Sequence, residues 1–315
     1  MQHDITIIGA AIMDVLAGPV DNSIFEKGSL PMKNINLSFG GDALNEAVIL
    51  SQLGADVELI SKVGNDEAGK RVLDFLKEKE VFSKIKVEDG LETGINIVLI
   101  DENGERRFLT NPDSSLRKLS EEDVMESLDE AGDIVCMASL FVSPLLDIGA
   151  MERIFKKIKS KPERIMIADM TTAKNGETIE DIANVLKYID YIIPNEVEAE
   201  RLTGEKDVYK NAELFLEHGV SCVVIKRGKN GCLIKTQNQQ IEVPAFIGAK
   251  VIDTTGAGDS FVAGFIWGLK NGWTLEECGR FGCAVASCTV EKIGANSAIQ
   301  SIELPMKRYH EMLNK

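Results

Sequence analysis

The sequence has little that would tie it to a membrane or to nucleic acid. No apolar stretch reaches the length needed to span a bilayer. The first residues lack a basic region followed by an apolar core, so we expect no signal peptide. Basic residues are few: 35 Lys and Arg stand against 50 Asp and Glu, giving a formal net charge of −15. Such a chain suits neither nucleic acids nor anionic membranes, although one of its pockets can be locally positive.

Cysteine and histidine are also scarce. The six cysteines form no CxxC pair, and Cys278, Cys283 and Cys288 stand five apart, which spreads them around a helix instead of along one face. The three histidines are far apart in the sequence. These spacings argue against a disulfide scaffold, a zinc site or a histidine metal site, and we expect a reduced, cytoplasmic protein.

Aromatic residues make up only 6% of the chain, and there is no internal repeat, low-complexity tract or proline-rich linker. The remaining composition is that of an ordinary globular protein, with 44% hydrophobic and 27% charged residues. With 315 residues the chain can bury a large core. We therefore predict one large α/β unit over residues 1–315.

Short apolar runs alternate with helical patterns along most of the chain. Examples are the predicted strands at 5–8 and 57–64 and the predicted helix at 42–53. This alternation predicts a mostly parallel sheet covered on both faces by helices. Two β-like segments, about 12–38 and 92–113, depart from it, and the second contains the hairpin signal Asp-Glu-Asn-Gly at 101–104. We interpret them as an accessory β-sheet that forms a lid, with a pair of surface hairpins as the alternative.

The most informative stretch is Asp-Thr-Thr-Gly-Ala-Gly-Asp-Ser-Phe at 253–261. Gly256, Ala257 and Gly258 are small enough for a turn that directs N–H groups at an anion. The apolar run after them predicts a buried helix whose N-terminus lies at the glycines. Asp259 would lie beside the anion, where its neighbours favour ionisation, and would act as a base on a substrate hydroxyl. The stretch predicts phosphoryl transfer; the alternative is a plain turn with Asp259 as the N-terminal cap.

A second group of polar residues lies in the first fifth of the chain. Gly40 and Gly41 allow a close approach of the backbone to a ligand, and Asp42 and Asn45 follow one helical turn apart. Their carboxylate and amide suit vicinal hydroxyl groups. Asp14 follows the first strand and adds a polar group at a carboxyl end, where α/β proteins bind ligands. The alternative is structural, with Asp42 as an N-cap and Asp14 as a turn residue.

Two motifs in the second half of the chain suit a magnesium nucleotide. Asn195 and Glu198 have the spacing of a capping box, and the same pair can organise water around Mg²⁺ and phosphates. Residues 226–231, Lys-Arg-Gly-Lys-Asn-Gly, end one predicted strand and turn into the next. They are either a basic hairpin or a nucleotide-facing loop in which glycines admit the ligand and a lysine meets phosphate.

Taken in order, these motifs resemble those of the ribokinase-like (PfkB-type) carbohydrate kinase family over nearly the whole chain. Residues 253–261 match its C-terminal signature, residues 40–69 its N-terminal signature, and Asn195 with Glu198 its N-x-x-E motif. The resemblance implies a doubly wound three-layer α/β/α sandwich with a small β-sheet lid, and a homodimer that pairs through the lid. It also implies an ATP-dependent sugar kinase that phosphorylates a hydroxymethyl group.

The resemblance assigns roles to individual residues. Asp259 would be the base, and Gly256, Ala257 and Gly258 the anion hole for the transferring phosphoryl group. The sugar would be held by Asp14, Gly41, Asp42 and Asn45. The Mg·ATP side would consist of Asn195, Glu198 acting on Mg²⁺ through water, Lys226, Gly228, Gly231 and Cys283, the last where many members have an asparagine near the adenine. Asp253 and Thr255 would give carbonyls to a monovalent cation such as K⁺ beside the anion hole, and the Gly294 loop would complete its site.

The substrate is the least determined part of this prediction. Ribokinases proper carry a glutamate after the mid-chain strand, and the run Ala-Ser-Leu-Phe at 138–141 lacks one, which disfavours ribose. Asn96 and Arg107 in the lid are assigned to the substrate, and Arg106 and Arg107 alternate faces on a strand, so at most one points inward. A sugar phosphate needs a cluster of basic residues, so we favour an unphosphorylated sugar. The alternatives are a nucleoside of the pseudouridine or adenosine type and a non-catalytic sugar or nucleotide sensor.

Overall fold

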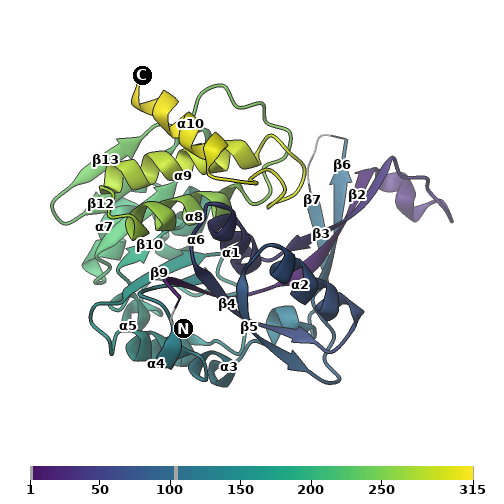
Figure 1. The fold of residues 1–315 in the computed structure, drawn as a ribbon, viewed down its shortest axis with the longest axis horizontal. Coiled ribbons are helices and arrows are strands. Elements are labelled where there is room, and N and C mark those ends of the chain that lie inside the picture. The colour runs from purple at the N-terminus through teal and green to yellow at the C-terminus, as the bar shows by residue number, and fades with distance from the viewer. Residues whose placement is uncertain (1–2, 103–105, 315) are drawn as a thin grey trace.

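A nine-stranded sheet forms the centre of the computed structural model, which describes residues 3–102 and 106–314 (Figure 1). Its strands, from one edge to the other, are β13 (Gln240–Val243), β12 (Cys232–Thr236), β11 (Cys222–Lys226), β10 (Tyr191–Ile192), β9 (Ile165–Met170), β8 (Ile134–Leu140), β1 (Ile5–Ile8), β4 (Val57–Gly64) and β5 (Phe82–Glu88). The seven strands from β11 to β5 pair in parallel. Strand β12 pairs antiparallel with both of its neighbours, β11 and β13. The predicted, mostly parallel sheet is confirmed.

Helices cover both faces of this sheet. One face carries α1 (Asp42–Gln52), α2 (Glu67–Glu78), α8 (Ala257–Lys270), α9 (Leu275–Thr289) and α10 (Glu303–Leu313). The other carries α3 (Glu121–Met125), α4 (Ile148–Ile158), α5 (Ala183–Leu186), α6 (Glu196–Thr203) and α7 (Val208–Glu217). Successive side chains of a strand point to opposite faces, so Ile7 joins the first core and Ile8 the second. The three-layer, doubly wound sandwich is confirmed (Figure 1).

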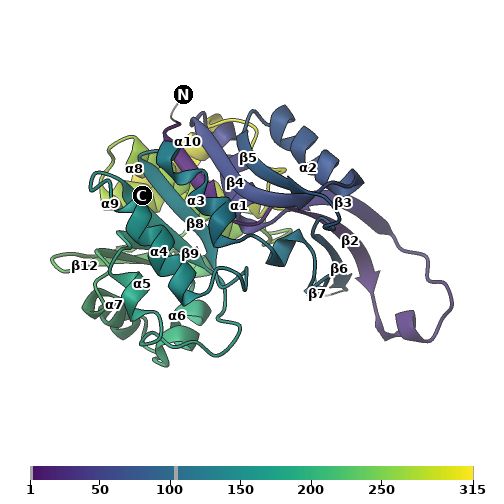
Figure 2. The same cartoon turned by 90° about the horizontal axis from the view of Figure 1, so that it is seen from below.

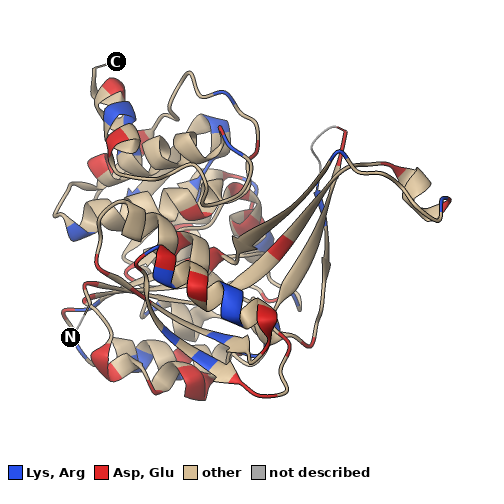
Figure 3. Cartoon of the chain, turned by 45° about the vertical axis from the view of Figure 1, so that its right-hand side comes forward, with Lys and Arg blue, Asp and Glu red and all other residues tan. Residues whose placement is uncertain are grey.

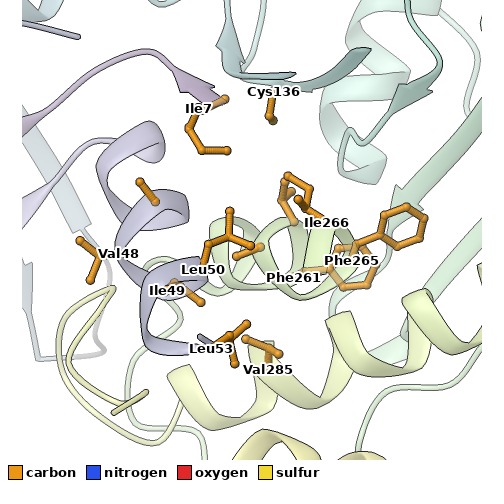
Figure 4. Packing of buried hydrophobic residues seen from close by; sticks show 14 of the residues in the cluster. Ile7, Val48, Ile49, Leu50, Leu53, Cys136, Phe261, Phe265, Ile266 and Val285 are labelled. Atoms are coloured by element: carbon orange, nitrogen blue, oxygen red, sulfur yellow. The ribbon is translucent and has the colours of Figure 1, made fainter. Parts of the chain in front are cut away.

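Helix α8 lies in the middle of the first core. Residues Ser260 to Ile266 of this helix are all buried, as expected for a helix that is apolar on every side. Phe261, Phe265 and Ile266 pack in one cluster with α1 and α9, as Figure 4 shows. This packing fixes the position of the helix N-terminus and of the glycine turn that precedes it.

A second sheet of four strands projects from the body (Figure 2). Its order is β3 (Asn34–Gly40), β2 (Ile12–Val20), β6 (Ile95–Asp101) and β7 (Arg106–Thr110). The segments predicted as an accessory sheet thus form a single sheet, here called the lid. Strands β6 and β7 pair as the predicted hairpin, whose turn residues Asn103 and Gly104 lie outside the described residues.

The two faces of the lid differ in chemistry. In register across the four strands, Ser38, Asp14, Asn96 and Thr110 form a polar row on the inner face. One position further along each strand, the side chains point to the outer face and form an apolar row of Leu37, Val15, Ile97 and Leu109. Large apolar side chains of the outer face, from Ile95 at 41% to Ile35 at 65%, are exposed. Figure 3 shows how few charged residues the lid strands carry.

Three further observations bear on the expectations from composition. Within residues 3–102 and 106–314, none of the helices combines the length and apolar character that a bilayer crossing requires. Over the same residues, His, Cys, Asp and Glu form no group of three or more suited to a metal ion. The six cysteines are all buried and unpaired.

Candidate active site

The glycine turn and Asp259 lie at the N-terminus of α8. Gly256 occupies the N-cap position with a φ of 70°, and a Cβ on it would overlap Ala295, so only glycine fits. Asp259 is in the first helical turn but does not cap the helix, because its carboxylate accepts a hydrogen bond of 2.7 Å from Nδ2 of Asn45. The capping alternative for Asp259 is therefore wrong, and its side chain faces α1.

The protonation of Asp259 differs from the expectation. Burial, and then the nearby carboxylate of Asp42, raise the pKa of Asp259 well above its ordinary value, against the opposing effects of Asn45 and Lys226. The prediction that the surroundings of Asp259 favour its ionisation is therefore wrong, because the effects that raise its pKa exceed those that lower it. A carboxylate whose pKa is raised takes up a proton more readily, which suits a general base.

Asn45 is held in the orientation that makes it a donor to Asp259. Its Oδ1 accepts a hydrogen bond of 3.1 Å from Nδ2 of Asn296, which also donates to the carbonyl of Phe39 at 3.2 Å. Asn296 is 9% exposed. The sequence reasoning missed Asn296, whose one signal is an amide side chain two residues after Gly294.

Asp42 and Asp14 bring two further carboxylates to the same region. Gly41, not Asp42, is the N-cap of α1, and the carboxylate of Asp42 accepts a hydrogen bond from Oγ of Ser139 at the end of β8. Asp14 lies within β2, where Nδ2 of Asn96 donates to it at 3.1 Å. Neither residue fills the structural role offered as its alternative. Burial raises the pKa of Asp14 to about 6, against the hydrogen bond from Asn96 and the charge of Arg106.

The lid strand β7 contributes an arginine, but not the predicted one. Arg106 pairs in register with Ile100, which places its side chain on the same inner face of the lid as that of Asn96. Its guanidinium forms an ion pair with Asp253. Arg107 pairs with Leu99 and is exposed on the outer face, away from Asp14. The structure therefore does not bring Arg107 to the other predicted residues. A cavity of about 370 Å³ lies between this inner face and Ile293 of the body.

Lys226 ends β11 beside the glycine turn, on the side of Gly258. Its Nζ donates to both carboxylate oxygens of Asp169, at 2.7 and 2.9 Å. Burial alone would lower the pKa of Lys226, but the carboxylates of Asp169 and Glu198 outweigh it and raise the pKa. The structure thus places a fixed cation next to the glycine turn. The position of Asp169 at the end of a strand can be predicted from the sequence, but its ion pair with Lys226 cannot.

The remaining predicted nucleotide residues have mixed surroundings. Asn195 and Glu198 form a complete capping box, with bonds of 2.7 and 2.9 Å. Gly228 has open space around it, whereas a Cβ on Gly231 would overlap the carbonyl of Val243, which explains that glycine by packing. Cys283 is buried in the core on α9.

Comparison with known proteins agrees with this geometry. The model of the family described as "pfkB family carbohydrate kinase" matches residues 2–302. The chain belongs to this family. It is 32% identical to an uncharacterized sugar kinase of Archaeoglobus fulgidus, over 79% of this chain and 97% of the relative. It is 29% identical to a ribokinase of Haemophilus influenzae, over 95% of this chain and 96% of the relative. A ribokinase structure from Thermotoga maritima superposes with a TM-score of 0.81 at 26% identity, covering 99% of this chain and 100% of the other.

This pfkB family carbohydrate kinase is accordingly an enzyme, and the ribokinase-like resemblance is confirmed. Its site is assembled from three separate parts of the chain: the lid with the start of α1, the end of β11, and the segment 253–259 with the loop 294–296. Hydrogen bonds of Asn45 to Asp259 and Asn296 connect the start of α1 with the third part, and Lys226 at the end of β11 lies beside Gly258.

Proposed function

We propose that this kinase transfers the γ-phosphoryl group of Mg·ATP to a hydroxymethyl group of an unphosphorylated sugar. The observation that supports it is the place of Asp259, next to the glycine turn and bonded to Asn45 on α1. The same helix begins with Asp42, near which Asp14 lies. A base is thus held between a turn suited to an anion and polar groups suited to sugar hydroxyls.

In the proposed reaction Asp259 takes the proton of the sugar hydroxyl while the hydroxyl oxygen attacks the γ-phosphorus. The bond between that phosphorus and the bridging oxygen breaks, and ADP leaves. The N–H groups at Gly256, Ala257 and Gly258, with the start of α8, stabilise the charge on the transferring group. Lys226 adds a positive charge beside Gly258.

We propose that Mg²⁺ enters with ATP and meets this protein through water. Glu198 accepts one hydrogen bond from the backbone of Asn195 and lies near the ammonium of Lys226. Mg²⁺ keeps several of its waters in nucleotide sites, so a carboxylate that bonds those waters suits it. Gly228, with open space around it, would face the nucleotide. We assign Cys283 no contact with it.

The charges near Asp259 favour a neutral sugar over a sugar phosphate. Asp14 and Asp42 lie on the sugar side, and the charge of Asp42 raises the pKa of both Asp14 and Asp259. A substrate phosphate would need several cations to offset them. The inward lid arginine, Arg106, is already paired with Asp253.

One observation favours a nucleoside as a second candidate. Phe108 lies in register with Val98 on the inner face of the lid and is 57% exposed. An exposed aromatic ring over a ligand site suits stacking against a planar base. If a nucleoside is the acceptor, Phe108→Ala should raise KM for it at least tenfold; for a free sugar, the change should be smaller.

We also infer that residues 1–315 act as one unit whose lid pairs with the lid of a second copy. The support is the apolar row of Leu37, Val15, Ile97 and Leu109 on the outer face. Exposed apolar patches of this kind mark protein interaction sites. Because the phosphoryl donor is ATP, we place the enzyme in the cytoplasm.

The test is ADP release with Mg·ATP across a panel of free sugars, sugar phosphates and nucleosides. We expect a strong signal for a free sugar that Asp259→Asn abolishes. Turnover of nucleosides alone would favour the second candidate. Sugar binding by calorimetry with no ADP release from any compound would contradict a kinase and favour a sensor.

A further inference from the structure

The ion pair between Arg106 and Asp253 connects the lid to the turn that is proposed to hold the phosphoryl group. Arg106 begins β7 on the inner face, and Asp253 lies three residues before Gly256. Both side chains are largely buried, at 16% and 4% exposure, although they are 147 positions apart in the sequence. A buried arginine–carboxylate pair of this kind requires the two segments to stay together.

The carboxylate of Asp253 joins a third segment as well. Its Oδ1 accepts hydrogen bonds of 2.9 Å from both the backbone N and Oγ1 of Thr255, and its Oδ2 accepts one of 2.9 Å from the backbone N of Gly294. Burial opposes ionisation of Asp253, but these bonds and Arg106 outweigh it and lower its pKa. Asp253 is therefore an anion that holds the turn, the 294 loop and the lid in one arrangement.

An anion at this place needs a positive charge beside it. The turn at Gly256 is proposed to bind a phosphoryl group, and an uncompensated carboxylate three residues away would repel that group. A guanidinium remains charged at any physiological pH and makes directional bonds to a carboxylate. Arg106 thus supplies both the charge and the geometry.

The resemblance to ribokinase-like enzymes implied a monovalent cation held by carbonyls of Asp253 and Thr255 and by the Gly294 loop, and the charges around Asp253 do not fit one. The structure does bring the three residues together, but N–H and O–H donors from Thr255 and Gly294 point at the carboxylate. The guanidinium of Arg106 takes up the rest of its charge. A free cation at the carbonyls of Asp253 and Thr255 would lie close to the guanidinium that is paired with Asp253, and Arg106 would repel it.

We propose that Arg106 takes the place of the monovalent cation, so that the lid itself carries the positive charge that orders the phosphoryl turn. Arg106 is on this view a positioning residue, acting on the turn through Asp253. The expected effect of Arg106 on phosphoryl transfer rests on the proposed function. The expectation that the stability of the fold does not depend on K⁺ does not rest on it.

The test compares KCl with tetramethylammonium chloride at equal ionic strength, with two measurements: the thermal unfolding midpoint and ADP release. For the unaltered enzyme we expect the same midpoint and a kcat within twofold in the two salts. Arg106→Gln should lose about tenfold or more in kcat and a few degrees in midpoint in tetramethylammonium, and K⁺ should restore part of both, because ligands that bind the folded state stabilise it. Arg106→Lys keeps a charge and should stay independent of K⁺.

Arg107→Gln is the matched control, one position along on the opposite face; its response to K⁺ should equal that of the unaltered enzyme. A midpoint or kcat of the unaltered enzyme that rises saturably with K⁺ would overturn the proposal. So would an Arg106→Gln variant that behaves as the unaltered enzyme in both salts. If no compound gives ADP release, the proposed function fails, and the unfolding midpoints still decide the role of Arg106. If Arg106→Gln does not fold, the same measurements in the two salts are compared between the unaltered enzyme and Arg106→Lys.

Discussion

The two sheets of this kinase differ in how their faces are covered. Every side chain of β1 in the central sheet is buried, because helices of the same chain lie on both sides. The lid has a polar inner face toward the site and an apolar outer face in solvent, with Leu37 at 59% exposure. The central sheet is therefore stabilised by its own chain. The lid is shaped for what lies against each face: a ligand on one side and, as proposed, a second copy on the other.

The largest effect is expected where the body supplies the chemistry. Asp259→Asn keeps the shape of the side chain and removes the base, so kcat should fall by roughly 10²–10⁴-fold with the unfolding midpoint at or above its original value. ADP release under saturating substrates measures it. Asp74→Asn, an exposed carboxylate on α2, is the control and should leave kcat unchanged. Near-normal turnover by Asp259→Asn would remove this residue from the mechanism.

The next effect separates the stability of the body from that of the lid. Phe265→Ala opens a cavity in the core beside α9 and should lower the free energy of unfolding by about 3–5 kcal/mol. Phe25→Ala, at the tip between β2 and β3 where the ring is 89% exposed, should change it by less than about 0.5 kcal/mol. Urea denaturation followed by circular dichroism measures both. Equal losses would mean that the tip packs against something in solution.

A third, smaller effect concerns the carboxylate that lies where lid and body meet. The pKa of Asp14 is raised from 3.8 to about 6, so the folded state holds its proton more tightly. The resulting stabilisation is full below about pH 4 and is lost as the pH rises through 6. Asp14→Asn should therefore be more stable than the unaltered enzyme at pH 8, by up to about 3 kcal/mol, with the difference shrinking toward pH 4.

The same variant should lose sugar affinity if Asp14 binds the sugar as proposed, because an amide accepts fewer hydrogen bonds from hydroxyl groups than a carboxylate does. Urea midpoints at pH 4, 6 and 8 and KM for the sugar measure the two effects. Asp74→Asn is again the control. A pH-independent difference in stability would show that the charge of Asp14 is not the cause.

The smallest expected effect tests the outer face of the lid. Leu37→Asp places a charge in the apolar row and should raise the dimer dissociation constant at least tenfold, about 1.4 kcal/mol, with little change in the stability of the subunit. Sedimentation velocity over a range of concentrations measures it. Ile247→Asp, which alters an apolar residue outside the lid that is even more exposed than Leu37, should leave the constant unchanged. A single monomer boundary for the unaltered enzyme at every concentration would contradict the pairing.

Much of the body could be predicted because its signals are local. Buried parallel strands are continuous apolar runs, and the glycine turn with Asp259 stands next to the helix that it begins. The lid arginine could not be assigned, because successive residues on a strand face opposite sides and a shift of one position exchanges them. The sequence pattern does not determine how β7 pairs with β6. The prediction therefore assigned Arg107 to the substrate, whereas the structure has Arg106 on the inner face.

Contacts made only by tertiary packing were also out of reach. Asn296 is 251 positions from Asn45, in a loop with no periodic pattern. The protonation of Asp259 was misjudged for the same reason. A helix N-terminus favours a carboxylate, but burial and the charge of Asp42 depend on how α1 packs on α8, and they outweigh it.

The chain passes between body and lid at four places, and the first two are hydrogen-bonded to each other. After β1 it crosses at Gly9 to Ala11, and after β3 it returns at Gly41, where the backbone N of Leu44 in α1 donates to the carbonyl of Ala10 at 3.2 Å. Any rotation of the lid must bend the chain at these residues as well as at 89–94 and 111–114, and the first two crossings stand next to Asp14 and Asp42. Sugar affinity is then the intrinsic affinity of the closed arrangement multiplied by the fraction of molecules that are closed. A substitution far out on the lid can change KM without touching the sugar.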